Sequence, residues 1–194
     1  MRYPWYELVD GNSPLDQGDL LFDCPVVFLD EQRFRSSPGE GFVSKLRETP
    51  VIASHDVVVM TQACDLRNQK VAHVILCPHY SLSIYEEEWK KQSVPAGQNP
   101  TDKGWKRHLD RICDGRIWNL TMLNQEEVNG YRVNMRIVDF HEIFSLPISV
   151  INLWLAELAQ PRVRLRPPYR EHLSQAFARF FMRVGLPIDI QRSW

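Results

Sequence analysis

The sequence predicts a mainly β protein of the α+β class, built on a small antiparallel barrel with a helical insertion and C-terminal helices. Two observations predict this class. Runs of β-branched and aromatic residues are joined by short polar stretches, which favours antiparallel neighbours over βαβ units, and helical patterns appear only later in the chain. We expect one domain over residues 1–194, with a barrel core at about 15–82 and 116–144, a helical insertion at about 83–116 and a C-terminal helical region at about 147–187.

The first half of the chain contains three β-rich segments. The first is "DLLFDCPVVFL", residues 19–29, in which Pro25 implies an edge position or a bulge. Residues 42–62 are expected to form a hairpin that breaks near Ser54 to Asp56, with a strongly buried second strand. The third segment, residues 71–82, follows after a short polar turn. Connections this short predict an antiparallel meander or a small barrel.

Helical patterns begin after the third strand, at residues 83–92 and 102–115. In the second of these, the spacing of Trp105, Leu109 and Ile112 forms a packing stripe. We therefore read this region as an insertion between strands.

Strands are expected again at residues 116–123 and 131–140, and Asn129-Gly130 is a turn signal between them. We expect a buried helix at residues 147–160, with Ser149 as its cap. The final helix is expected at about 168–184 and would end at Gly185 and Pro187. One face of that helix is apolar and would close the core; it carries Leu173, Phe177, Phe180 and Val184.

Composition narrows the function classes. The chain has 194 residues, 44% of them hydrophobic, and a net charge of −1, which argues against nucleic-acid binding by bulk charge alone. The charge is uneven, because residues 161–194 carry +5 and the remainder −6. No stretch approaches the length of a membrane span, no signal-peptide region opens the chain, and the four widely spaced cysteines lack a C-x-x-C pair. We expect a soluble cytoplasmic protein with reduced thiols and no membrane partner.

The stretch "VVVMTQACDLRN", residues 57–68, is the first candidate site. A strand leaves the core there through Thr61, Cys64 and Asp65, and His79 lies at the end of the next strand. These four residues are the candidate catalytic set, with His79 as base or acid. The alternative is structural: Thr61 satisfies backbone groups, Cys64 packs as a small hydrophobe, and Asp65 caps the turn.

A metal site is the second possibility. Cys64, Cys77 and His79 could hold zinc if the strand ends meet, with Cys24 or His55 as the fourth ligand. The spacing matches no standard zinc motif, so buried free cysteines are the default, and we expect no cofactor unless zinc is bound.

Two basic segments are candidate surfaces for nucleic acid or a protein partner. The helix at 102–115 interleaves basic and aromatic side chains, a combination that suits single-stranded nucleic acid. The segment "RVRLR", residues 162–166, alternates arginines with apolar residues. The alternatives are a solvated helix face with a buried tryptophan, and arginines paired with the acidic body. The residues concerned are Lys103, Trp105, Lys106, Arg107, Arg111, Arg162, Arg164 and Arg166.

The combination of "QGDLLFDCPVV", "VVVMTQACDL", "IVDFHEIFSLP" and "RLRPPYREHLSQAFARFFMRVGLP" resembles a widespread set of bacterial proteins marked by a TQxCDL motif. That resemblance covers most of the chain and implies a bacterial, cytoplasmic protein of unassigned function.

A second resemblance concerns the fold. The order "GDLLF", "DVVVMTQ", "HVILCPH" and "VNMRIVDFHEI" is similar to the SH3-like barrel of the MazF/PemK growth-inhibitor ribonucleases, whose first strand opens on a Gly-Asp, here Gly18-Asp19. It implies that the barrel is SH3-like, and that phosphodiester cleavage is a possible activity.

These observations favour a non-enzymatic binding or accessory protein of a bacterial multi-gene system, such as a defence or toxin–antitoxin system. It would act through protein or nucleic-acid contacts, since no complete catalytic constellation is visible. The alternatives are a MazF/PemK-like endoribonuclease, with Arg67 or Arg47 supplying charge, and a zinc-binding protein.

Overall fold

The structure is a computed structural model that describes residues 3–36, 41–93 and 100–182. The strands within these residues are β1 (Tyr6–Val9), β2 (Asp19–Leu29), β3 (Pro50–Val59), β4 (His73–Ser81), β5 (Leu120–Leu123), β6 (Glu126–Val128), β7 (Tyr131–Val133), β8 (Arg136–Asp139), β9 (Phe144–Pro147) and β10 (Arg162–Leu165). The helices are α1 (Glu31–Ser36), α2 (Phe42–Glu48), α3 (Ala63–Arg67), α4 (Leu82–Ser93), α5 (Asp102–Cys113), α6 (Ile148–Leu158) and α7 (Tyr169–Phe181).

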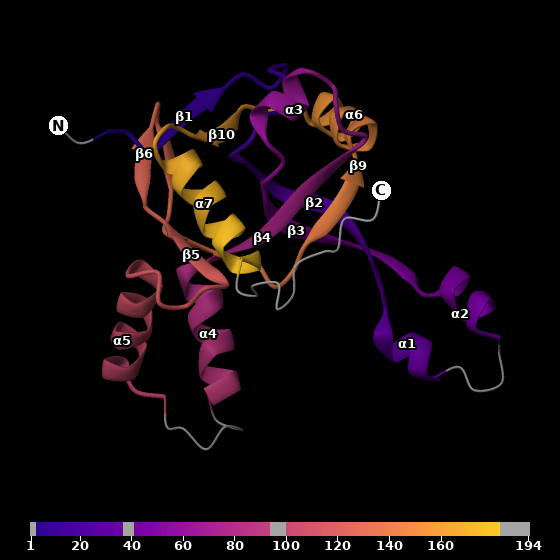
Figure 1. Ribbon diagram of the computed structural model, residues 1–194, viewed down its shortest axis with the longest axis horizontal. Coiled ribbons are helices and arrows are strands. Elements are labelled where there is room, and N and C mark those ends of the chain that lie inside the picture. Colours follow the sequence, from indigo (N-terminus) through magenta and orange to yellow (C-terminus); the bar gives the residue numbers. More distant parts are fainter. Residues whose placement is uncertain (1–2, 37–40, 94–99, 183–194) are drawn as a thin grey trace, which may run out of the picture.

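The protein is a mixed α+β structure around one antiparallel sheet (Figure 1). The strand order is β1-β10-β2-β3-β4-β8-β5, and β9 also pairs with β4. β4 is central because one of its edges pairs with β3 while the other pairs first with β9 and then with β8. Among the described residues the sheet does not close into a barrel, so the SH3-like barrel stays a prediction.

Both faces of the central strands are buried. Val58 and Cys77 belong to a core on one face, which α7 covers, whereas Val57 and Val59 belong to a second core, which α6 covers. A strand covered on both sides needs apolar residues at successive positions, which explains the unbroken Val57 to Met60 run. A third, smaller cluster joins α5 to β5 and β8.

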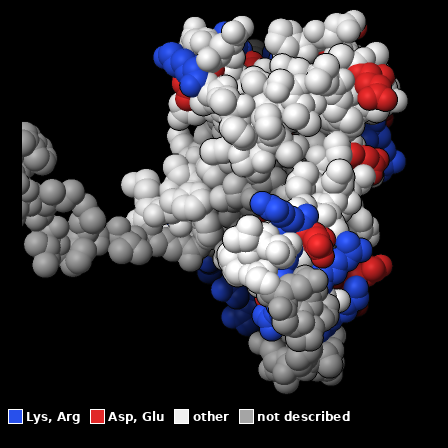
Figure 2. Space-filling model, turned by 90° about the vertical axis from the view of Figure 1, so that its right-hand side faces the viewer, with Lys and Arg blue, Asp and Glu red and all other residues white. Residues whose placement is uncertain are grey.

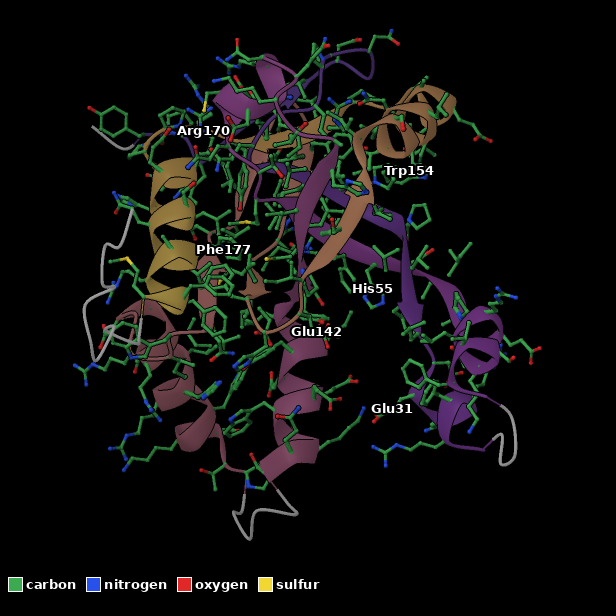
Figure 3. The ribbon with its side chains drawn as sticks, turned by 45° about the vertical axis from the view of Figure 1, so that its right-hand side comes forward. Glu31, His55, Glu142, Trp154, Arg170 and Phe177 are labelled. Carbon is green, nitrogen blue, oxygen red and sulfur yellow. The ribbon has the colours of Figure 1, made fainter. Side chains whose placement is uncertain are left out.

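β2 and β3 continue beyond the sheet as a two-stranded ribbon, with α1 and α2 at its far end (Figure 1). We call residues 24–55 the arm. Figure 3 places His55 at its root and Glu31 at its far end. One face of the ribbon exposes apolar side chains, including the cross-strand pair Val27 and Ile52.

The prediction of a hairpin over residues 42–62 is wrong. β3 runs without a break from Pro50 to Val59, through the position where the break was expected. Residues 42–48 form the helix α2. A short apolar run is compatible with either structure, and periodicity alone did not distinguish them. The expected irregularity near Pro25 is confirmed as a bulge in β2 between Leu21 and Cys24.

The remaining elements agree more closely with the predictions from the sequence. The helical insertion is confirmed as α4 and α5, and the Asn129-Gly130 turn as the tip of the β6–β7 hairpin, where both residues have positive φ. The strand expected at 131–140 is instead two strands, β7 and β8. The strands β1, β6 and β9 and the short helices α1 and α3 were not predicted. The final helix is confirmed as α7, whereas its expected end at Gly185 and Pro187 lies outside the described residues.

Candidate functional site

The "TQACDL" segment follows the end of β3 and leads through Thr61 and Gln62 into the short helix α3. The Thr61 hydroxyl oxygen accepts a hydrogen bond from the Ile75 backbone N–H at 2.7 Å, which ties the segment to β4. Cys64 is exposed, with its Sγ 3.7 Å from Gln62 Oε1 and 3.8 Å from Asp65 Oδ1. Both neighbours are oxygens that carry no positive charge, so neither would stabilise a thiolate. Thr61 thus has the expected structural role, whereas Cys64 is exposed and does not pack as a small hydrophobe, and the N-cap of α3 is Gln62, not Asp65.

His79 lies elsewhere on the sheet. Ile75, which Thr61 contacts, precedes His79 by four positions on β4. At about 3.3 Å per strand residue this separates them by roughly 13 Å. The structure therefore does not bring His79 together with Cys64 and Asp65.

His79 instead belongs to a buried polar cluster with Arg136 and Asp56. Arg136 Nε donates a hydrogen bond to His79 Nδ1 at 2.9 Å, and the same guanidinium forms an ion pair with Asp56. The Phe22 ring lies over this pair, 4.9 Å from Arg136 Cζ and edge-on to the His79 ring. The backbone N–H of Asp23 completes the arrangement by donating to Asp56 Oδ1 at 3.1 Å. The β2 bulge thus covers the cluster.

This environment decides what the imidazole can do. Burial, together with the Arg136 charge, holds the pKa of His79 well below its usual value, so the ring is neutral. Since Nδ1 accepts from Arg136, the proton resides on Nε2, which is buried and has no partner among the described residues. A neutral ring with its acceptor nitrogen occupied cannot serve as a base or as a strong acid at neutral pH.

The zinc ligand set is not assembled either. Within the described part of the chain, no three His, Cys, Asp or Glu residues are grouped so that they could hold a metal ion. Cys77 is in the core, where burial raises the pKa of its thiol to about 12, while Cys64 is exposed beyond the end of β3. Cys24 is buried as well, and burial raises the pKa of its thiol to about 12. Buried thiols held in the neutral form are poor metal ligands.

A larger polar network, which the sequence did not single out, surrounds Asp19. This carboxylate is fully buried and pairs with both Arg162 and Arg164 of β10; its Oδ2 lies 3.4 Å from Arg162 Nε and 3.0 Å from Arg164 Nη2. Arg162 also donates to the carbonyl oxygens of Gly11 at 3.0 Å and Ser13 at 2.7 Å.

The two arginines therefore take the internal role that the sequence had left open, and only Arg166 of "RVRLR" is exposed. The signal that could have identified the network is the Gly18-Asp19 pair at a strand start, because Gly18 has a φ of 84° that favours glycine.

The basic helix α5 keeps its cations on the surface. Lys103, Lys106, Arg107 and Arg111 are all exposed. Trp105 is buried, however, and so is not available to stack on a base. It packs in an aromatic cluster with Tyr85, Trp89 and His108, which joins α5 to α4. A hollow of about 590 Å³ lies beside this cluster, lined among others by Trp89, Arg107, His108 and Arg111.

α6 has an unusual surface. Ile151 and Leu155 point into the second core, yet Val150 and Leu153 are exposed on the outer side, Leu153 by 73%. Glu157 is the helix's only charged residue. The upper part of the face seen in Figure 2, where α6 lies, has few charged side chains except at its margins. The prediction that residues 147–160 form a helix is confirmed, but only half of the helix is buried in this chain.

Comparisons of the chain with family models, with curated proteins and with solved structures find no match. The candidate functional site therefore rests on the geometry of the structure alone.

The described helices include none that is both long enough and apolar enough to cross a membrane. α6 exposes apolar side chains, and the hollow beside α5 is lined by exposed arginines. The Asp19 and His79 clusters, in contrast, are internal. The first two are the candidate functional surfaces.

Proposed function

We propose that this chain is a non-enzymatic binding protein, an accessory component of a bacterial multi-gene system, and that its protein partner docks on the outer face of α6. The observation that carries the proposal is the exposure of Val150, Leu153 and Leu158 on α6, beside a single charged residue, Glu157. Large apolar side chains grouped on an exposed helix face mark interaction sites, so we explain the exposed apolar residues of α6 by a partner that covers them.

The outer face of α6 has the shape expected of a helix-binding site. Val150 and Leu153 are three residues apart and so lie one above the other on the outer face. A groove of about 860 Å³ runs along one flank of α6, between Asn152 and Ala156 of the helix and Leu66 and Arg67 of α3.

A smaller groove, lined by Trp154 and Leu158, runs along the other flank of α6. Figure 3 shows Trp154 on the side of α6 that faces the sheet. An amphipathic helix of the partner would lay its apolar side chains along Val150 and Leu153, between the two grooves.

The test is capture of the partner from an extract of the source cells by tagged full-length chain. Leu153→Lys should abolish capture, because it places a charge at the centre of an apolar contact. Ile84→Lys is the matched control, since Ile84 is an exposed apolar residue on α4, 58% exposed, away from α6. This control should capture the same protein as the wild type, as identified by mass spectrometry.

Two results would contradict the proposal. One is a wild-type chain that elutes as a lone monomer and captures nothing at low or high salt. The other is equal loss of capture in Leu153→Lys and Ile84→Lys, which would mean that the contact is not at α6.

The SH3-like barrel and the ribonuclease activity of the MazF/PemK type stay predictions. Binding is preferred over cleavage because the groups named for cleavage lie on separate parts of the sheet, and the histidine among them is sealed and neutral.

A further inference from the structure

Two cations that line the hollow between α4 and α5 form no ion pair within the described part of the chain. Arg107 and Arg111 both line it, and neither forms an ion pair with a described residue. Arg116 also lines the hollow but is paired with Asp114, at 3.2 Å between Nε and Oδ2. Asp110 is the other acidic residue in the lining, so three arginines against two aspartates leave a local charge of +1. Two guanidinium groups remain available for an anion.

The aromatic wall of the hollow is held in place from behind. His108 stacks on Trp105 with ring centroids 5.9 Å apart and on Tyr85 at the same separation. The Tyr85 hydroxyl hydrogen-bonds to His108 Nε2 at 3.1 Å, and Trp89 packs against both Trp105 and His108. The Trp89 and His108 rings are thus positioned before any ligand arrives, which lowers the entropic cost of binding.

We propose that this hollow binds a nucleotide, with its phosphate on Arg107 and Arg111 and its base against the wall formed by Trp89 and His108. Guanidinium groups match phosphate oxygens in geometry and charge, and aromatic faces stack on bases of any sequence. The volume of about 590 Å³ suits a ligand of that size.

The nucleotide could be free or part of single-stranded RNA, since the same groups would recognise both. The site is independent of the partner surface proposed on α6, because α4 and α5 lie at the opposite end of the molecule (Figure 1). Loss of one function would leave the other intact.

The experiment measures binding of three probes to the full chain: a fluorescein-labelled 12-nucleotide single-stranded RNA, ATP and inorganic phosphate. Arg107→Ala/Arg111→Ala should weaken binding of RNA or ATP by about tenfold or more, because each arginine makes a charge-assisted hydrogen bond to phosphate. With RNA, the slope of log K against log salt should fall by about 1.4 for two lost phosphate contacts.

Lys103→Ala/Lys106→Ala is the matched control. This variant also removes two positive charges from α5, but at exposed residues that do not line the hollow. We expect less than about threefold weakening in this variant, through the long-range field alone. Arg107→Lys/Arg111→Lys keeps the charge and should restore part of the affinity, which a structural role for the arginines would not predict. Thermal unfolding of each variant checks that the fold is intact.

Binding of ATP identifies a free nucleotide as the ligand, whereas binding of RNA without ATP identifies the single strand. Equal weakening by the arginine and lysine variants would overturn the proposal, because it would reduce the effect to general surface charge. Binding of phosphate as tightly as ATP would overturn the role of the aromatic wall. Absence of binding by all three probes would overturn the site altogether.

Discussion

Asp19 is the residue through which the N-terminal loop, β2 and β10 are held together. Its carboxylate accepts from the Asp16 backbone N–H at 3.1 Å as well as from the two arginines of β10. Buried charges are tolerated only when they are paired in this way. The main cost of losing Asp19 is therefore that the buried arginine would be left without a counter-charge.

Asp19→Ala should lower the free energy of unfolding by about 3–5 kcal/mol, because it leaves Arg162 buried without its counter-charge. Urea denaturation of the purified chain measures this change. Glu87→Ala removes an exposed carboxylate from α4 and should stay within about 0.5 kcal/mol of the wild type. An Asp19→Ala loss no larger than that of the control would show that the network is dispensable.

His79 should make stability depend on pH. The unfolded chain binds a proton at this residue below about pH 6.5, while the folded chain does not, because the folded-state pKa is lowered. The contribution of His79 is therefore fully present above pH 6.5 and is lost as pH falls below it, by up to about 1.4 kcal/mol per pH unit.

His79→Gln keeps an acceptor for Arg136 but cannot titrate. Urea denaturation between pH 7.5 and pH 5 should show a shallower loss of stability in this variant than in the wild type. His73→Gln, at an exposed position on the same strand, should retain the wild-type slope. Parallel curves for the wild type and His79→Gln would mean that the imidazole is not buried as described.

The elements differ in how well local sequence predicts them. α5 and α7 have polar and apolar residues on opposite faces, and both were predicted within a few residues. The segment at 42–48 is too short and too apolar for periodicity to separate helix from strand. For α6 the helix was predictable, whereas its half-exposure was not, because an apolar residue looks the same whether it faces the core or a partner.

The arm illustrates the same limit. Its strands were predictable from their β-branched residues, yet nothing local indicates that Val27 and Ile52 face outward. An isolated two-stranded ribbon is marginally stable in water, so the helices at its tip and the His55–Phe144 contact at its root help to hold it, with ring centroids 5.2 Å apart.

At the scale of the whole molecule, the separation of the candidate catalytic groups leads to a prediction about activity. The purified chain should leave a mixed RNA substrate intact with and without divalent metal, since His79 is neutral and sealed by Phe22. Gel analysis of the RNA measures this, with the His79→Gln variant purified in parallel to reveal contaminating nuclease. Cleavage by the wild type that disappears in the variant would restore the ribonuclease interpretation.

The sequence by itself predicted the strand segments of β2 and β4, the position of the helical insertion, and the burial of the Val57 to Met60 run. These properties depend on neighbouring residues and their periodicity. Only the tertiary structure decided which polar groups meet.

Asp19 and Arg162 are 143 positions apart, and His79 and Arg136 are 57 apart. Their contacts depend on the pairing register of β10 with β2 and of β8 with β4. A shift of one residue in either register would turn these side chains to the opposite face. For that reason Cys64 and His79 could be named as candidates from the sequence, but their separation in the fold could not be predicted.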